Sequence, residues 1–215
     1  MPPRESSLRR LVVEGIDDKF SIIALMSRHG TRWDERASET VLPFVWSAGG
    51  ITEVLDAVTV AAKSYERLGI VVDADLDLAA RYEQLRARFG NAGLEVPSEP
   101  AVDGIIFPGT RPGSRIGIWV MPNNSVAGTL EDFLARLVPT GDPIWSHAET
   151  CTTRAREMGS RLLEKDQLRG HLHTWLAWQE TPGNPFGTAI TAHTLGHDSP
   201  EAQKFVSWFN QIFVL

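Results

Sequence analysis

Short apolar runs alternate with stretches of helical periodicity through the first half of the chain. Apolar residues dominate positions 11–13, 41–46, 70–72 and 116–121, and each run has the length of a buried strand. Between the runs, apolar residues recur at helical spacing and predict helices at about 17–28, 54–68 and 78–89, and from 129 onward. This alternation is typical of βαβ units. We therefore predict an α/β fold with a parallel sheet covered by helices on both faces.

The strongest helical signal lies between residues 54 and 68. The stripe consists of Val54, Val58, Ala61, Tyr65 and Leu68. Gly69 is predicted to end this helix, and the strand at 70–72 follows at once.

The second half is predicted to be mainly helical, with segments near 145–164, 167–178 and 199–213. Ser199 and Pro200 suit the N-cap and first position of the last helix. Trp175 and Trp178, three apart, are expected to share a helix face that packs against the sheet. With no convincing linker, we predict one domain over residues 1–215, with an α/β core at 8–135 and a helical extension at 140–215.

Composition limits the functions open to this protein. The net charge of -6 is unusual for a protein that grips nucleic acid unaided, so such binding would need a local basic face, a partner protein or bridging metal ions. Cys151 is the single cysteine, which excludes an internal disulfide and a Cys-rich zinc site. No signal peptide or membrane-spanning run is evident. We expect a cytoplasmic protein that does not bind membranes; oligomer formation stays open.

Acidic residues follow two of the predicted strands at the point where each strand ends. Glu14 follows the first strand, and Asp73 and Asp75 follow the third. Ligands of open α/β sheets bind at the carboxyl ends of strands, and converging carboxylates suit Mg²⁺ or Mn²⁺. A structural role is the alternative, because Asp and Glu are also common at helix N-termini. Asp17 and Asp18 suit a first helical turn, and Asp77 suits the cap of the helix at Leu78.

These motifs resemble the Toprim domain, which topoisomerases, bacterial primases, recombination mediators and overcoming-lysogenization-defect nucleases share. The resemblance covers about residues 8–135 and rests on VEGIDD at 13–18 and DADLD at 73–77. The whole chain, including HTWLAWQETPGNPFGTAI, is also similar to small bacterial Toprim-like proteins. The resemblance implies that Glu14 acts in acid–base chemistry or metal binding, and that Asp73 and Asp75 hold magnesium.

The nuclease branch of that family implies further site residues. It adds an acid at the position of Asp18 and acids after the fourth strand, where this chain has Glu131 and Asp132. Thr129 with Asp132 also resembles a helix capping box. The metal-ligand candidates are Glu14, Asp18, Asp73, Asp75, Asp77 and Asp132.

The branch also uses a distal lysine to stabilise the transition state. The corresponding segment, residues 169–173, contains no lysine. Lys165 lies upstream, and Arg169 or His171 could replace it. We take Glu14 and Arg169 as the candidate catalytic residues.

Two functions follow as hypotheses. The first is magnesium-dependent phosphodiester chemistry on nucleic acid, as in a nuclease of defence or repair. The second is a non-catalytic module that binds metal, phosphate or nucleotide in a regulatory or partner-binding role. A phosphatase or receiver protein fits less well, because it would not carry the Glu-Gly signature. Arg111 and Arg115, in a Gly/Pro-rich loop, could contact phosphate or simply be solvated.

Overall fold

The computed structural model describes residues 7–33 and 42–214. Within these residues, the chain builds a five-stranded sheet in the order β2-β1-β3-β5-β4. The strands are β1 (Arg9–Val13), β2 (Phe44–Ser47), β3 (Arg67–Asp73), β4 (Ile105–Pro108) and β5 (Arg115–Met121). Neighbouring strands run parallel, except that β4 is antiparallel to β5. The predicted α/β class is confirmed.

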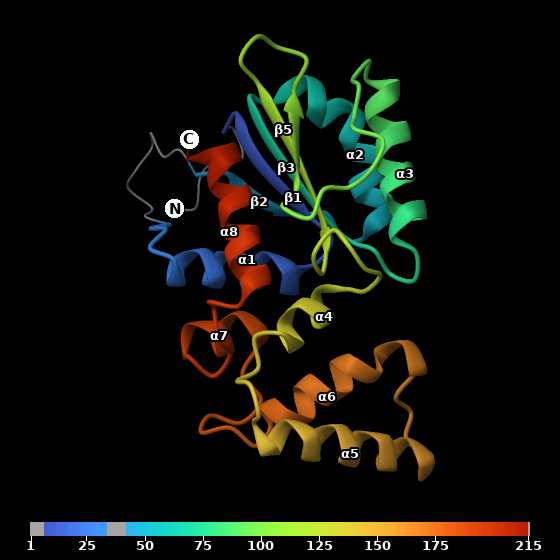
Figure 1. Cartoon of the computed structure of the whole chain (residues 1–215), viewed down its shortest axis with the longest axis vertical. Helices are drawn as coiled ribbons and strands as arrows, with labels where there is room; N and C mark the ends of the chain where they lie inside the picture. Colours follow the sequence, from blue (N-terminus) through green and yellow to red (C-terminus); the bar gives the residue numbers. More distant parts are fainter. Residues whose placement is uncertain (1–6, 34–41, 215) are drawn as a thin grey trace.

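Helices cover both faces of this sheet, as Figure 1 shows. The helices are α1 (Ile16–Arg28), α2 (Ile51–Ser64), α3 (Leu78–Asn91), α4 (Leu130–Ala135), α5 (Pro143–Glu157), α6 (Gln167–Leu176), α7 (Phe186–Thr191) and α8 (Pro200–Phe213). A short 3-10 helix, η1 (Glu164–Asp166), precedes α6. Because successive strand residues point to opposite faces, Val12 packs with α2 and α3 while Leu11 and Val13 pack with α1 and α8.

Two paired glycines allow α8 to approach the sheet closely. Gly69 of β3 lies opposite Gly117 of β5. A Cβ at Gly117 would lie 2.0 Å from Cδ1 of Ile212, and one at Gly69 would lie 3.1 Å from Phe213. The missing side chains therefore leave the space that the apolar stripe of α8 occupies. Trp208 of the same helix donates a hydrogen bond to the carbonyl of Ile105 at 3.2 Å.

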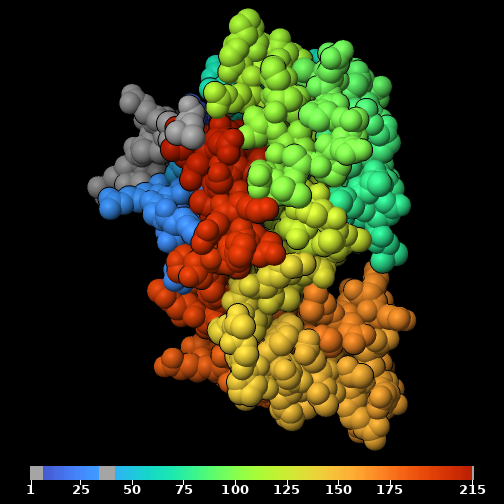
Figure 2. All heavy atoms as spheres, viewed as in Figure 1, coloured from blue at the N-terminus to red at the C-terminus, as the bar shows by residue number. Residues whose placement is uncertain are grey.

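The helices α5 and α6 form an antiparallel pair beyond the carboxyl edge of the sheet (Figure 1). In the space-filling view they form the lower part of the molecule, and the surface is indented where they meet the part that contains the sheet (Figure 2). Trp175 is buried between the helices and donates to Asp142 at 3.0 Å. Among the described helices, none combines the length and apolar character that crossing a bilayer requires.

Several predicted boundaries were wrong. The helix predicted at 54–68 ends at Ser64. Tyr65 has an extended backbone, and Leu68 lies in β3. Leu68 pairs with β1 and β5 at once, so sheet pairing overrides its helical spacing. The helix predicted at 145–164 ends at Glu157, two residues before Gly159, whose φ is +90°. Residue 41, placed in the second strand, lies outside the described residues.

Other features were missed. Neither the strand β4 nor the helix α7 was predicted from the sequence. Trp178 does not pack against the sheet, because its side chain is 47% exposed and stacks on His147 instead.

Gly104 provides a test of how closely α8 docks. Its φ is +85°, and a Cβ there would lie 2.2 Å from the ring of Trp208. Gly93 has nearly the same φ, +80°, but its Cβ would meet nothing within 4 Å. We expect Gly93→Ala to lower the free energy of unfolding by about 1 kcal/mol through backbone strain. Gly104→Ala should lower it by a further 1–3 kcal/mol, roughly, because the indole must move. Urea unfolding measures both; equal losses would contradict close docking.

Candidate functional site

The carboxyl ends of β1 and β3 form the topological switch point of the sheet. The chain leaves β1 for β2 on one side and returns to β3 on the other, which opens a crevice between the two strand ends. Glu14 directly follows β1, and Asp73 is the last residue of β3. The backbone N–H of Asp73 donates to Oε1 of Glu14 at 2.8 Å. The structure thus brings these two predicted residues into direct contact.

Hydrogen bonds between loops bring α4 to the same place. Asp75, whose φ is +53°, exchanges two backbone hydrogen bonds with Gly128. Two residues on, the backbone N–H of Leu130 donates to Oδ1 of Asp73 at 2.9 Å. The N-terminus of α4 is therefore fixed against the end of β3, and Glu131 enters the site with it.

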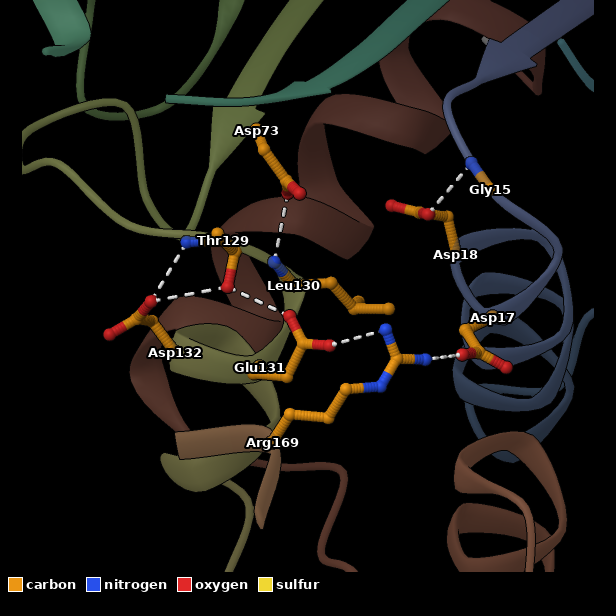
Figure 3. A network of polar contacts seen from close by, with 9 residues as sticks. All are labelled: Gly15, Asp17, Asp18, Asp73, Thr129, Leu130, Glu131, Asp132 and Arg169. Carbon is orange, nitrogen blue, oxygen red and sulfur yellow. Dashed lines mark hydrogen bonds and ion pairs between the residues drawn. The ribbon is translucent and has the colours of Figure 1, made fainter. Parts of the chain in front are cut away.

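Asp18 brings a third carboxylate from the first turn of α1. Its Oδ2 accepts a hydrogen bond from the backbone N–H of Gly15 at 3.0 Å. Its Oδ1 is buried and has no hydrogen-bond partner among the described residues. Figure 3 shows the Asp18 carboxylate pointing toward that of Asp73. A buried oxygen without a partner is energetically unfavourable, and here it faces a second acid.

Burial raises the pKa of all three carboxyls. Burial, reinforced by the negative charge of Glu14, raises the pKa of Asp18 to about 7, although the bond from Gly15 opposes it. Burial and the charges of Asp18, Glu14 and Glu131 raise the pKa of Asp73 to about 9. Burial also raises the pKa of Glu14, and the bond from the Asp73 backbone opposes that shift. The carboxylates repel one another when ionised, and a bound proton or cation would relieve that repulsion.

Asp18 and Asp73 line a pocket of about 960 Å³. Its walls come from the start of α1, the end of β3 with Asp75 and Leu76 after it, the segment 127–132 that leads into α4, and the segment 165–169 across η1 and α6. Acidic side chains predominate on these walls; among the described lining residues, Lys165 and Arg169 are basic. Lys165 is exposed and has no hydrogen bond or ion pair with a described residue.

Arg169 joins two walls of the pocket. Its guanidinium forms an ion pair with Asp17 of α1 and, at 3.5 Å, with Glu131 of α4. Thr129 donates to the other carboxylate oxygen of Glu131 at 2.8 Å. We call Asp17, Arg169 and Glu131 the Arg169 clasp; Figure 3 shows it spanning from α1 to α4 beside Asp73 and Asp18. The sequence proposed Arg169 as a site residue but did not predict its partners.

The remaining metal-ligand candidates have structural partners. Asp75 is more than half exposed and forms an ion pair with Arg81 at 2.5 Å. Asp77 caps α3 by accepting from Ala80 at 3.0 Å, which is the structural alternative that the sequence left open. Asp132 accepts from the backbone of Thr129 at 2.8 Å and so completes the capping box of α4, although it also lines the pocket.

Arg81 is a site residue that sequence reasoning missed. Its Nε donates to the carbonyl of Asp73 at 2.8 Å, while the same guanidinium binds Asp75 and Gln84. Its side chain is 10% exposed. Arg81 therefore fixes the loop after β3 and holds the Asp75 carboxylate. Its position one turn into α3 is the one sequence signal that could have suggested this role.

The other basic candidates lie elsewhere. Arg115 begins β5 and Arg111 precedes it, so both lie at the amino ends of the strands, opposite the pocket. His171 is buried on α6, where burial lowers its pKa, and it packs edge-on against Trp145. Neither His171 nor the two arginines line the pocket, which leaves Lys165 and Arg169 as its cations.

Whether a metal ion fits this pocket depends on the number of protein ligands that the ion requires. Among the described residues, no three His, Cys, Asp or Glu side chains form a ready-made metal cluster. Mg²⁺, however, often binds through one or two carboxylates and fills its remaining positions with water and substrate phosphate. Asp18, with its unpartnered Oδ1, and Asp73 beside it fit that requirement. Glu14 supports Asp73 from the neighbouring strand.

Comparison with known proteins places this arrangement in a family. The profile of the family described as "Protein of unknown function (DUF3226)" matches residues 8–214. The chain belongs to this family. Searches of curated proteins and of solved structures find no match. Because the match runs through both the sheet and the helices α5 and α6, every wall of the pocket lies within the family's span.

The raised pKa values predict an unusual pH dependence. The values of about 7 for Asp18 and about 9 for Asp73 exceed the ordinary 3.8, so from about pH 4 to 9 the folded state binds more protons than the unfolded state. Their stabilising contribution is complete below about pH 4 and is lost as the pH rises, so the metal-free protein should become less stable.

Asp73→Asn tests this directly, because Asn keeps an acceptor for the Leu130 N–H but cannot ionise. At about pH 8 the free energy of unfolding of the variant should exceed that of the parent by more than about 1 kcal/mol, since one pKa unit corresponds to about 1.4 kcal/mol. At about pH 4 this difference should vanish. Urea unfolding in EDTA measures both. A parent protein whose stability rises from pH 5 to 8 would contradict the assignment.

Proposed function

We propose that this protein binds a divalent cation, Mg²⁺ or Mn²⁺, at Asp18 and Asp73 and uses it to hydrolyse phosphodiester bonds of nucleic acid, as the resemblance to the Toprim nucleases implies. The observation that carries the proposal is the buried Oδ1 of Asp18, which has no hydrogen-bond partner in the described part of the chain and points toward the Asp73 carboxylate. A hard cation would give that oxygen a ligand and relieve the repulsion between the two acids.

The surroundings support a reaction at phosphorus. A bound cation would neutralise phosphate oxygens and stabilise the charge that develops on them during hydrolysis. Lys165 and Arg169 supply positive charge on the opposite wall, where the sequence lacked the expected lysine. Glu14 is a candidate acid–base group because burial raises its pKa. Asp18, by the same reasoning, could exchange a proton near neutral pH when no cation is bound.

The alternative is a module that binds metal and phosphate without turnover. One observation favours it: Arg169 is paired with two carboxylates, those of Asp17 and Glu131, so its positive charge is already neutralised. A phosphate oxygen must compete with Asp17 and Glu131 for that guanidinium. Lys165 alone would then supply a free positive charge on the described part of the pocket wall, which suits binding better than stabilisation of a transition state.

Calorimetric titration with Mn²⁺ tests the cation site. Asp18→Asn and Asp73→Asn should each weaken Mn²⁺ binding by about tenfold or more, because the cation loses a charged ligand. Asp77→Asn is the matched control, since Asn still caps α3 and the side chain is outside the pocket. Mn²⁺ should raise the Tm of the parent and of the control but not of the two site variants.

Incubation with single- and double-stranded DNA and RNA, with Mg²⁺ or Mn²⁺, then separates the two functions. Cleavage that EDTA and Asp73→Asn abolish supports the nuclease. Tight binding of nucleotide with no cleavage supports the binding module. Equal Mn²⁺ affinity in the parent and in Asp18→Asn would contradict a cation site at these residues.

A further inference from the structure

The Arg169 clasp joins three of the elements that line the pocket. Asp17 lies in the first turn of α1 and Glu131 in the first turn of α4, and each belongs to a different wall. The guanidinium of Arg169 bridges the two, so three separate elements are joined by side chains. Glu131 is firmly placed, because its side chain is only 14% exposed and also accepts from Thr129.

Asp73 and Asp18 lie between the clasp and the ends of the strands. The sheet bounds these acids on one side, α1 and α4 flank them, and the clasp lies opposite the sheet (Figure 3). A nucleic-acid strand that is cut internally must continue past the reacting phosphate in both directions. A strand that ran from the sheet toward α6 would meet the strand ends in one direction and the clasp in the other (Figure 3). The volume of about 960 Å³ suits a ligand of nucleotide size.

The charge of the pocket walls also disfavours a long strand. Acidic residues outnumber basic ones among the described lining residues, and the chain as a whole has a net charge of -6. A long strand would bring several phosphates against these walls, and each would be repelled unless a cation neutralised it. A strand end or a free nucleotide brings few phosphates, and these can share Lys165 and the bound cation.

We propose that the pocket accepts the end of a strand, or a free nucleotide, and not the interior of a continuous strand, and that the Arg169 clasp imposes this choice. The inference rests on the proposed function and specifies its substrate. In hydrolysis of the last phosphodiester linkage, the oxygen of water would bond to the phosphorus, the P–O bond to the leaving oxygen would break, and that oxygen would take the proton of water, which releases the terminal nucleotide. The clasp is a pair of partly exposed ion pairs, so its effect is on the order of tenfold and not absolute.

A single-stranded DNA oligonucleotide and its covalently closed circle give the sharpest test, because they share sequence, length and charge. With Mg²⁺, the parent should bind the linear form about tenfold more tightly than the circle, as measured by fluorescence anisotropy, and should shorten only the linear form. Adenosine 5′-monophosphate is the arm for free nucleotides: it should compete with the linear form for the pocket.

Asp17→Asn should open the clasp on the α1 side, keep Arg169 and the proposed cation ligands, and reduce the preference for the linear form to less than about threefold. Asp56→Asn is the matched control, because it removes an exposed ion pair between α2 and α3, away from the pocket. It should leave the preference unchanged. Equal binding and equal cleavage of circle and linear DNA by the parent would overturn the inference while leaving the proposed function intact. If neither DNA nor the nucleotide binds, both are overturned.

Discussion

The site depends on the burial of two carboxylates, Asp18 and Asp73, that face each other without a neutralising side chain between them. Arg169 on the pocket wall instead binds Asp17 and Glu131. Burial of a charge is unfavourable unless it is paired, so in the metal-free protein these acids tend to hold protons. Under the proposed function, a cation would replace those protons and gain two anionic ligands. The stability of the protein would then be coupled to the occupancy of the pocket.

Hydrogen bonds from backbone N–H groups stabilise the buried carboxylates. Asp18 accepts from Gly15, Asp73 from Leu130, and Glu14 from Asp73. Each acid thus has one oxygen satisfied by an N–H group that has no partner within its own helix or strand end. These bonds fix the orientation of the side chains and leave the second oxygens for a ligand. The bond from Leu130 also attaches α4 to the end of β3, and the bond from Asp73 to Glu14 joins the ends of β3 and β1, so the elements that build the pocket also position its acids.

Part of this site could be predicted from the sequence, because it depends on the ends of strands. Glu14 and Asp73 follow apolar runs whose period identifies buried parallel strands, and such strands deliver their last residues to one edge. Asp77 and Asp132 were harder to assign, since an acid just before or within the first turn of a helix suits both a metal ligand and a helix cap. In the structure, both cap helices, while Asp75, which was expected to hold magnesium with Asp73, forms an ion pair with Arg81.

What sequence could not predict are the contacts between residues far apart in the chain. The bond between Arg169 and Asp17 spans 152 positions, and nothing local in either segment indicates it. Likewise, the helical spacing of Leu68 predicted a helix, but pairing with both neighbouring strands decided its conformation. The structural role of Gly69 and Gly117 also depends on a distant segment, because the residues that pack against them, Ile212 and Phe213, belong to α8.

The position of α6 links the helical part of the chain to the chemistry of the sheet edge. A sheet edge with three carboxylates would by itself be an open cation site that any phosphate could approach. Lys165 and Arg169 line the same pocket and add the positive charge that such an edge lacks; under the proposed function they would also restrict the approach to it. Because Arg169 is balanced by one acid from α1 and one from α4, a phosphate gains its guanidinium only by displacing a carboxylate. Under the proposed function, the helical part would therefore set both the affinity of the pocket for anions and the shape of the ligand that can enter.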